Sequence, residues 1–369
     1  MVEDKKWTNF IDFNLLLNAL FICCAGFMVL VSVNPAKLWS GVFHLCVSLV
    51  LMYWAATRSL STLQKFAFRY YFLCLILLAA VFFWGDTSKG AKRWLNFGLF
   101  RLQPSELMKV AIPLLLSSMF SQKDKNIDVG TYFFATIVLV VPVFLVLKQP
   151  DLGTALLIFS SGFCVLVLVG LSWKVILFGV ISIALLYPFL CGTPFPSIIH
   201  HPLLHSYQCK RLFIFWDPYA DPFGSGYHTI QATIAIGSGG FWGEGWLHGT
   251  QSHLDFIPES HTDFAFAVFA EEFGFFGSSI LLLLYGNLIL RSFWIAWSSQ
   301  SVFSSLLAGS LACTFLTYVS ANIGMVTGLI PVVGVPLPYV SYGGSSMMTL
   351  FFSLGLLMSI HRQRHLVSV

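Results

Sequence analysis

The chain has 369 residues and a formal net charge of +4, and 57% of its residues are hydrophobic while only 10% are charged. Together with a mean hydropathy of +0.80, this composition excludes an ordinary soluble domain. The apolar runs are long enough for membrane helices and lack the short alternating segments of an outer-membrane barrel. We therefore predict an all-α polytopic membrane protein, and we expect no nucleic acid among its partners.

About ten membrane-spanning helices are predicted from the apolar runs, and an even number places both termini on the same side. The Lys and Arg residues of the connections slightly favour the cytoplasm for that side. The chain is predicted to form one membrane domain, residues 1–369, with a large extramembrane loop at 192–262 between helices 7 and 8. The predicted spans are approximately 13–33, 39–57, 66–84, 103–120, 131–148, 152–170, 173–191, 264–290, 302–324 and 340–360.

The 192–262 loop is a candidate functional region, because loops of this length in compact domains usually have a function. It is rich in glycine between Gly224 and Gly249, which permits tight turns and a close approach of the backbone to a ligand. Its histidines follow no common zinc-site spacing. A disulfide between Cys191 and Cys209 has little support, since nothing else in the sequence indicates a disulfide framework.

Carboxylates are concentrated at the end of this loop and at the start of the next helix. Half of the 16 Asp and Glu residues lie between Asp217 and Glu272, and no Lys or Arg occurs between Arg211 and Arg291. The counter-charge must therefore come from elsewhere in the chain, from solvent, or from a divalent cation such as Mg²⁺ or Mn²⁺. No organic cofactor is expected. Helix geometry predicts that Glu271 and Glu272 lie at the membrane boundary.

Asp263 is the candidate general base, and Glu259, His261 and Thr262 are candidate substrate-binding residues beside it. A carboxylate at the lip of an apolar helix is partly desolvated, which makes it a better base near neutral pH. Such a group would meet substrates that combine a polar head with a lipid tail. The alternative is that Asp263 caps the helix, since Asp is a preferred N-cap residue. The two roles are compatible.

A second group of candidates lies in GAKRWLNFGLFRLQPSELMK, residues 90–109. Arg and Lys both bind phosphate groups, so the cations of this segment suit a pyrophosphate. Glu106 and Lys109 share a helix face and are expected to pair at the start of the fourth span. The alternative is a rim of snorkelling side chains plus one structural ion pair. The candidate substrate-binding residues here are Lys92, Arg93, Arg101, Glu106 and Lys109.

Asp151, in the segment KQPDLGTA, is a further candidate. It lies in a short break between two apolar spans, where an acidic side chain could face the same site. A capped turn is the simpler interpretation, because Asp is common both at turns and at helix N-caps.

Taken together in chain order, five motifs resemble the SEDS family (shape, elongation, division and sporulation). The spacing and length most resemble the rod-shape-determining branch of that family. The resemblance covers nearly the whole chain, except that SIIHHPLLHSYQCKR departs from the pattern at the start of the large loop. The motifs are GAKRWLNFG with QPSELMK, KQPDLGTA, GYHTIQATIAIGSGGFWGEGW, PESHTDFAFAVFAEEFG and PYVSYGGSS.

The resemblance implies an inner-membrane peptidoglycan glycosyltransferase with ten helices and a periplasmic active site. Such an enzyme polymerises lipid II into a glycan strand and works with a class B penicillin-binding protein and other proteins of the elongation complex. By the same resemblance, Asp263 matches the catalytic aspartate, Glu106 and Lys109 match polar residues of a central cavity, and Asp151 matches a further acidic position.

Two other interpretations stay open at the level of the sequence. A lipid II flippase would also need charges within a membrane bundle, although no paired broken helices mark an alternating-access site. A non-catalytic scaffold of the elongation complex would need no catalytic carboxylate at all.

Overall fold

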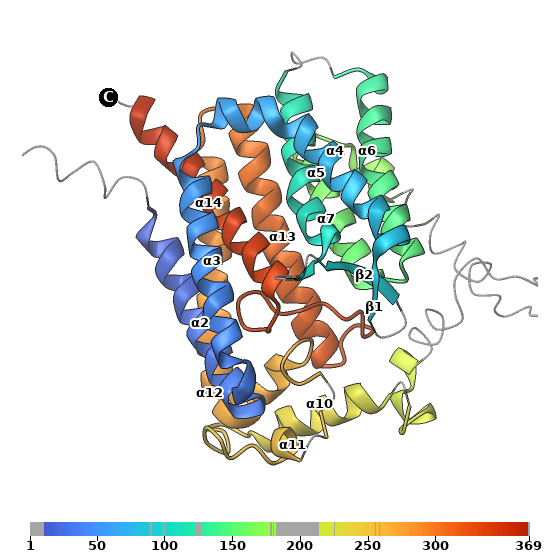
Figure 1. Cartoon of the computed structure of the whole chain (residues 1–369), viewed down its shortest axis with the longest axis vertical. Coiled ribbons are helices and arrows are strands. Elements are labelled where there is room, and N and C mark those ends of the chain that lie inside the picture. Colours follow the sequence, from blue (N-terminus) through green and yellow to red (C-terminus); the bar gives the residue numbers. More distant parts are fainter. Residues whose placement is uncertain are drawn as a thin grey trace, which may run out of the picture.

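The computed structural model describes residues 11–88, 91–96, 98, 101–122, 127–177, 179, 181, 214–224, 226–254, 256–257 and 259–367. Long helices dominate these residues and run side by side as a bundle (Figure 1). The long helices are α2 (Phe13–Val33), α3 (Leu38–Thr57), α4 (Leu60–Trp84), α5 (Pro104–Ser121), α6 (Val129–Lys148), α7 (Leu152–Val169), α12 (Ala265–Trp297), α13 (Val302–Val326) and α14 (Gly344–Val367).

By length and composition, 8 helices of the described residues can cross a membrane, namely every one of these except α5. The predicted polytopic helical fold is therefore confirmed, and nine of the predicted spans overlap these helices, with ends that differ by up to seven residues. The predicted span at 173–191 is helical over 173–177 and lies mostly outside the described residues. Cys191 and Cys209 also lie outside them, so the expectation that they form no disulfide is not tested.

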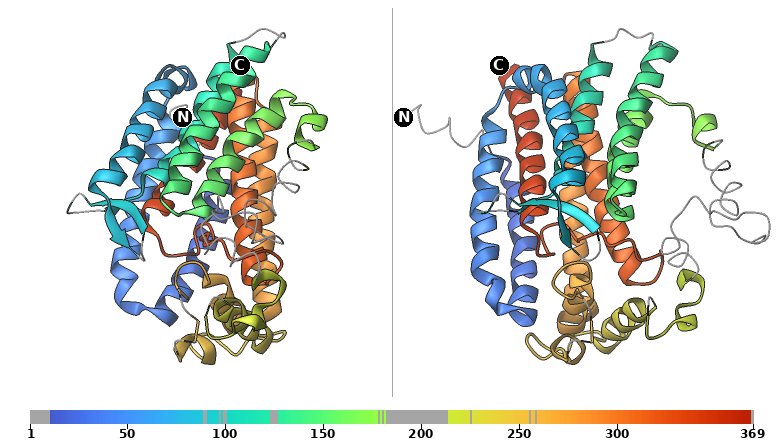
Figure 2. Two further views of the ribbon diagram at one scale, coloured as in Figure 1. Left: turned by 90° about the vertical axis from the view of Figure 1, so that its right-hand side faces the viewer. Right: turned by 45° about the vertical axis from the view of Figure 1, so that its right-hand side comes forward.

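Helix α5 is enclosed by the bundle, although it is less apolar than its neighbours. It packs against α4, α7 and α13, and nearly all of its side chains are buried. Around it, α14 packs along α3, and α12 packs along α2 and α13 (Figure 2). The charges at the start of α5 are therefore inside the protein, so they need partners there.

The segment between α4 and α5 forms a small antiparallel sheet, which the sequence analysis treated only as a basic loop. Its strands are β1 (Asp86–Ser88), β2 (Ala91–Asn96) and β3 (Arg101–Leu102), in the order β1-β2-β3. Alternation along β2 buries Leu95 and leaves Lys92 exposed. The sheet lies beside the bundle, part of the way along it (Figure 2).

The large loop contains the helices α10 (Tyr227–Ser238) and α11 (Thr250–His253), which lie across one end of the bundle (Figure 1). Its glycine-rich part closes a break in α12. Gly274 has φ 63° and ψ −164°, which interrupts the hydrogen bonds of the helix. The backbone at 240–245 replaces them, because N–H groups of Glu244 and Gly245 donate to the carbonyls of Glu271 and Glu272 at 3.0 and 3.1 Å.

The sequence predicted that the backbone of the glycine-rich loop approaches a ligand. In the structure this backbone approaches that of α12 instead. Glu271 and Glu272, which were predicted to lie at the membrane boundary, are only 0% and 1% exposed beneath this loop. Glu271 accepts a hydrogen bond from the backbone N–H of Gln251 at 2.7 Å, and Glu272 accepts one from Ser32 of α2. The Glu271 carboxylate thus joins α12 to the loop, whereas the Glu272 carboxylate joins α12 to α2.

Replacing Gly243 with Ala is expected to detach this loop from α12. Gly243 has φ +84°, and an added Cβ would lie 2.1 Å from the carbonyl oxygen of Glu272. The strain alone is worth about 1–3 kcal/mol, and the clash with backbone adds to it. Thermal unfolding and proteolysis of the loop should both show the loss. Gly237→Ala is the matched control, because nothing lies within 4 Å of its added Cβ; equal stability of the two variants would contradict the prediction.

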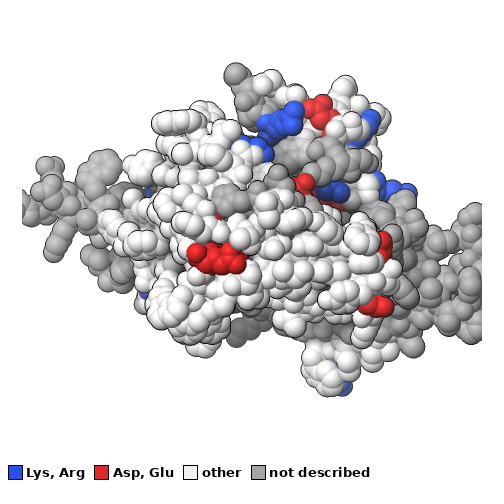
Figure 3. Space-filling model, turned by 90° about the horizontal axis from the view of Figure 1, so that it is seen from below, with Lys and Arg blue, Asp and Glu red and all other residues white. Residues whose placement is uncertain are grey.

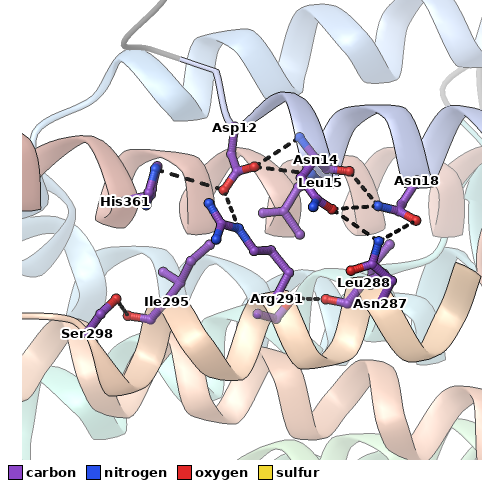
Figure 4. Close-up of polar contacts among 11 residues, drawn as sticks. Asp12, Asn14, Leu15, Asn18, Asn287, Leu288, Arg291, Ile295, Ser298 and His361 are labelled. Carbon is purple, nitrogen blue, oxygen red and sulfur yellow. Dashed lines mark hydrogen bonds and ion pairs between the residues drawn. The ribbon is translucent and has the colours of Figure 1, made fainter.

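A polar network fastens α2, α12 and α14 at the opposite end of the bundle (Figure 4). Asp12 caps α2 by accepting from the N–H groups of Asn14 and Leu15. Its Oδ2 also lies 2.9 Å from Nε of Arg291 on α12 and 4.0 Å from Nε2 of His361 on α14. Because Ser32 bonds to Glu272 at the other end of α2, these two groups of contacts fix both ends of this helix.

Candidate active site

A cavity of about 220 Å³ lies where the 259–264 loop, the 333–346 segment, β2 and the starts of α5 and α7 meet. It contains Asp263 and most of the acidic candidates from the sequence. Seen from the α10 end, the described surface is mostly uncharged, with separate acidic and basic patches (Figure 3). The charged residues that line the cavity are Arg93, Glu106, Asp151, Glu259 and Asp263.

Asp263 lies immediately before the start of α12 and is half-buried. The N-cap residue of α12 is Phe264, whose side chain makes no capping hydrogen bond, so Asp263 lies one residue before the N-cap position. One carboxylate oxygen lies against the backbone of Gly334, where an added Cβ would be 3.3 Å from Oδ2. The Pro- and Gly-rich segment before α14 therefore forms the wall beside the candidate base.

The backbone of the 261–263 segment is held by donors from α13 and from the segment that follows it. Its three successive carbonyls accept hydrogen bonds from the N–H of Tyr342 at 2.9 Å, from Oγ of Ser341, and from Nδ2 of Asn322 at 2.8 Å. Asn322 also donates to the carbonyl of Val335 at 2.7 Å. One side chain thus fixes both the Asp263 loop and the opposite wall of the cavity.

Asn322 is 0% exposed, and we expect Asn322→Ala to lower the polymerisation rate more than it lowers substrate affinity. The substitution leaves two buried carbonyls without this donor, at a cost of about 1–3 kcal/mol, and loosens the position of Asp263. Steady-state kinetics would separate kcat from KM. Ser310→Ala on the same helix is the control, since the Ser310 hydroxyl donates to the carbonyl of Leu307 within that helix. If Asn322→Ala had the same kcat as Ser310→Ala, the positioning role would be refuted.

The predicted pairing of Glu106 and Lys109 is confirmed, and both interpretations of this segment include such a pair. They are 3% and 2% exposed, and Nζ of Lys109 lies 2.6 Å from Oε1 of Glu106. Tyr318 of α13 completes the group, because its hydroxyl donates to Oε2 of Glu106 at 3.2 Å and accepts from Lys109. Glu106 lines the cavity, whereas Lys109 lies behind it.

Asp151 has both of the roles that the sequence left open. Its Oδ1 accepts from the N–H of Thr154 at 3.1 Å and caps α7. Its Oδ2 lies 3.5 Å from Nε of Arg93 on β2, and Arg93 also donates to the carbonyl of Pro150 at 2.7 Å. Arg93 therefore contacts the start of α7 and also lines the cavity, so its predicted role as a pyrophosphate ligand stays a prediction.

The remaining candidates lie outside the acidic cavity or at its boundary. Arg101 and His261 line a second cavity of about 790 Å³, and Glu259 and Thr262 line both cavities. Glu259 has φ 57°, a left-handed conformation that is uncommon for a residue with a side chain and often marks a functional site. Lys92 is exposed and lines neither cavity.

Three residues of the site were missed by the sequence analysis. Asn322 and Tyr318 are polar residues inside the apolar run 302–326, and both lie on the side of α13 that faces the site. Their spacing of four residues places them on one helix face, which is a signal that could have identified them. Trp94 lines both cavities, but only the unpredicted strand β2 brings it there.

The fold and the cavity define a polytopic membrane protein with an enclosed acidic site at the meeting point of several helices. The sequence matches the FtsW, RodA and SpoVE family, described as "Cell cycle protein", over residues 11–366. Because this match covers nearly the whole chain, the chain belongs to that family.

Relatives and solved structures agree with this membership. Peptidoglycan glycosyltransferase MrdB of Escherichia coli K12 is 48% identical over 298 residues, covering 81% of this chain and 78% of that relative. MrdB of Helicobacter pylori is 36% identical over 375 residues, covering 99% of this chain and 94% of that relative. The crystal structure of the rod shape determining protein RodA of Thermus thermophilus has a TM-score of 0.72 at 29% identity, covering 96% of this chain and 97% of that chain.

A further structure is described as "Structural coordination of polymerization and crosslinking by a peptidoglycan synthase complex". One of its chains matches with a TM-score of 0.82 at 32% identity, covering 96% of this chain and 98% of that chain. The similarity to the rod-shape-determining branch, expected from the motifs, is thereby confirmed.

Proposed function

We propose that this chain is a peptidoglycan glycosyltransferase that polymerises lipid II during cell-wall elongation, with Asp263 as its general base. The observation that carries this proposal is the half-buried Asp263 carboxylate in a cavity with Glu106, Asp151 and Glu259. The names of the relatives, peptidoglycan glycosyltransferase MrdB, support the same activity.

In the proposed reaction, a sugar hydroxyl of one substrate attacks the anomeric carbon of the other. Asp263 accepts the hydroxyl proton, the new glycosidic bond forms, and the polyprenyl pyrophosphate departs with the electrons of the broken bond. Direct displacement needs one base and no covalent intermediate, so it inverts the anomeric centre.

A divalent cation remains part of the proposal only as a partner of the substrate. Among the described residues, no group of three or more His, Cys, Asp or Glu is arranged to hold a metal ion. Mg²⁺ is commonly held by one or two carboxylates together with substrate phosphates, and Asp263 and Glu259 could supply such oxygens. Bound in that way, the cation would neutralise charge on the pyrophosphate.

We further propose that the active site faces the periplasm, that both termini are cytoplasmic, and that a class B penicillin-binding protein is the partner. The similarity to a chain of the peptidoglycan synthase complex supports such a partner. The N-terminal end of α2 and the C-terminal end of α14 meet at one end of the bundle, away from α10 and α11 (Figure 1). This arrangement supports the placement of both termini on one side.

The test is to place the purified protein and its penicillin-binding partner in liposomes with labelled lipid II. Glycan strands of many units are expected, and chelation of divalent cations should slow their formation if a cation assists. Translocation of lipid II without polymer would favour the flippase alternative. Absence of both products, with the complex intact, would favour a scaffold.

A further inference from the structure

The second cavity differs in charge from the cavity that contains Asp263. It adjoins the acidic cavity along a shared wall that includes Trp94, Glu259 and Tyr342. Its own charged lining residues are Lys37 and Arg101, with Glu259 contributing from the shared wall. Carboxylates thus outnumber cations in the first cavity, whereas cations outnumber carboxylates in the second.

Lys37 lies at the end of the short helix η1 (Pro35–Lys37), between α2 and α3. Its Nζ donates to Nε2 of His261 at 2.8 Å and lies 5.3 Å from the centre of the Tyr342 ring. The Tyr342 hydroxyl is held in turn by Oγ of Ser40 at 2.9 Å. These contacts orient the ammonium group, but an imidazole and a phenol ring do not neutralise its charge.

No carboxylate in the described part of the chain forms an ion pair with Lys37. This contrasts with Arg93, which is paired with Asp151, and with Lys109, which is paired with Glu106. Lys37 is therefore an oriented cation in a space of about 790 Å³. An anionic ligand with several oxygen acceptors would complete the coordination of such a cation.

We propose that Lys37, together with Arg101, binds the pyrophosphate group of a polyprenyl-linked ligand in the second cavity. This inference rests on the proposed function and names the group that this part of the site recognises. From the basic segment between α4 and α5, it uses Arg101. His261 is a positioning residue, because it orients Lys37 and lies two residues before Asp263.

The experiment measures equilibrium binding of labelled polyprenyl pyrophosphate to the purified full-length protein in detergent. Wild type is compared with Lys37→Gln and Lys37→Arg, and each is prepared in an Asp263→Asn background that prevents turnover. Lys148→Gln is the matched control, since Lys148 is an exposed lysine that lines neither cavity. Polyprenol without phosphate, inorganic pyrophosphate and phosphatidylglycerol are the comparison ligands.

Lys37→Gln should weaken binding of polyprenyl pyrophosphate about tenfold or more, as expected for the loss of a charge-assisted contact. Lys37→Arg should retain most of the affinity, and Lys148→Gln should retain all of it. Inorganic pyrophosphate should compete in the wild type, whereas binding of polyprenol should be the same in every variant.

Three results would overturn the proposal: equal affinity of Lys37→Gln and wild type, an equal loss of polyprenol binding, or competition by phosphatidylglycerol alone. The last would mean that the site recognises a membrane lipid headgroup. Because binding is measured without turnover, a failure of the polymerase assignment would leave this result interpretable by itself.

Discussion

Replacing Asp263 with Asn is expected to abolish glycan-strand formation while the protein remains folded and bound to its partner. The amide has nearly the same shape as the carboxylate but cannot accept the proton of the attacking hydroxyl. Loss of a general base costs about 10²–10⁴-fold in rate. Polymerisation of labelled lipid II by the purified complex measures the effect.

The control for this experiment is a neighbouring acid that has a structural role. Glu271→Gln is suitable, because the Glu271 carboxylate accepts from the backbone N–H of Gln251 and lines neither cavity. Glu271→Gln should keep the wild-type polymerase activity per amount of folded protein. Asp263→Asn should lose this activity while its stability stays at the wild-type level. Polymer from Asp263→Asn at the wild-type rate would show that another group is the base.

Replacing Lys109 with Met is expected to have the largest effect on stability. In the wild type, Nζ of Lys109 lies 2.6 Å from Oε1 of Glu106. The substitution removes this cation and leaves the buried Glu106 carboxylate with Tyr318 alone. Breaking a buried ion pair in this way costs about 3–5 kcal/mol. The melting temperature in detergent should fall sharply, and much of the protein should be lost during expression.

A second substitution separates the cost of the unpaired charge from the loss of the lysine itself. Glu106→Gln combined with Lys109→Met removes both charges and should recover most of the melting temperature. Because Glu106 lines the cavity, its substitution can change activity directly. The double variant is therefore compared by its melting temperature and not by its activity. If the double variant were as unstable as the single one, packing around Lys109, rather than charge pairing, would be the cause.

Much of the fold follows from hydrophobic length alone. A helix that crosses a membrane must satisfy its backbone hydrogen bonds internally and present about 20 apolar residues, so the spans can be recognised without knowing their neighbours. The pairing of Glu106 and Lys109 was also predictable, because residues three positions apart share a helix face. Asp263 could be singled out because it stands at the start of an apolar helix.

The contacts of the site between residues far apart in the sequence could not be predicted in this way. Asn322 acts on residue 263 across 59 positions of sequence, and Lys37 contacts His261 across 224 positions. Neither contact leaves a periodic signal, since each depends on how α13 and the α2–α3 connection pack against the Asp263 loop. The small sheet was missed for a related reason, because its short strands show little alternation of apolar and polar residues.

By itself, the sequence determined that the chain is a helical membrane protein and that its acidic residues concentrate near Asp263. Both properties depend on composition and on local spacing along the chain. Only the tertiary structure decided which charges neutralise one another: Arg93 pairs with Asp151, Glu271 and Glu272 are enclosed beneath the glycine-rich loop, and Lys37 faces the second cavity. Electrostatic energy depends on distance and burial, and packing sets both.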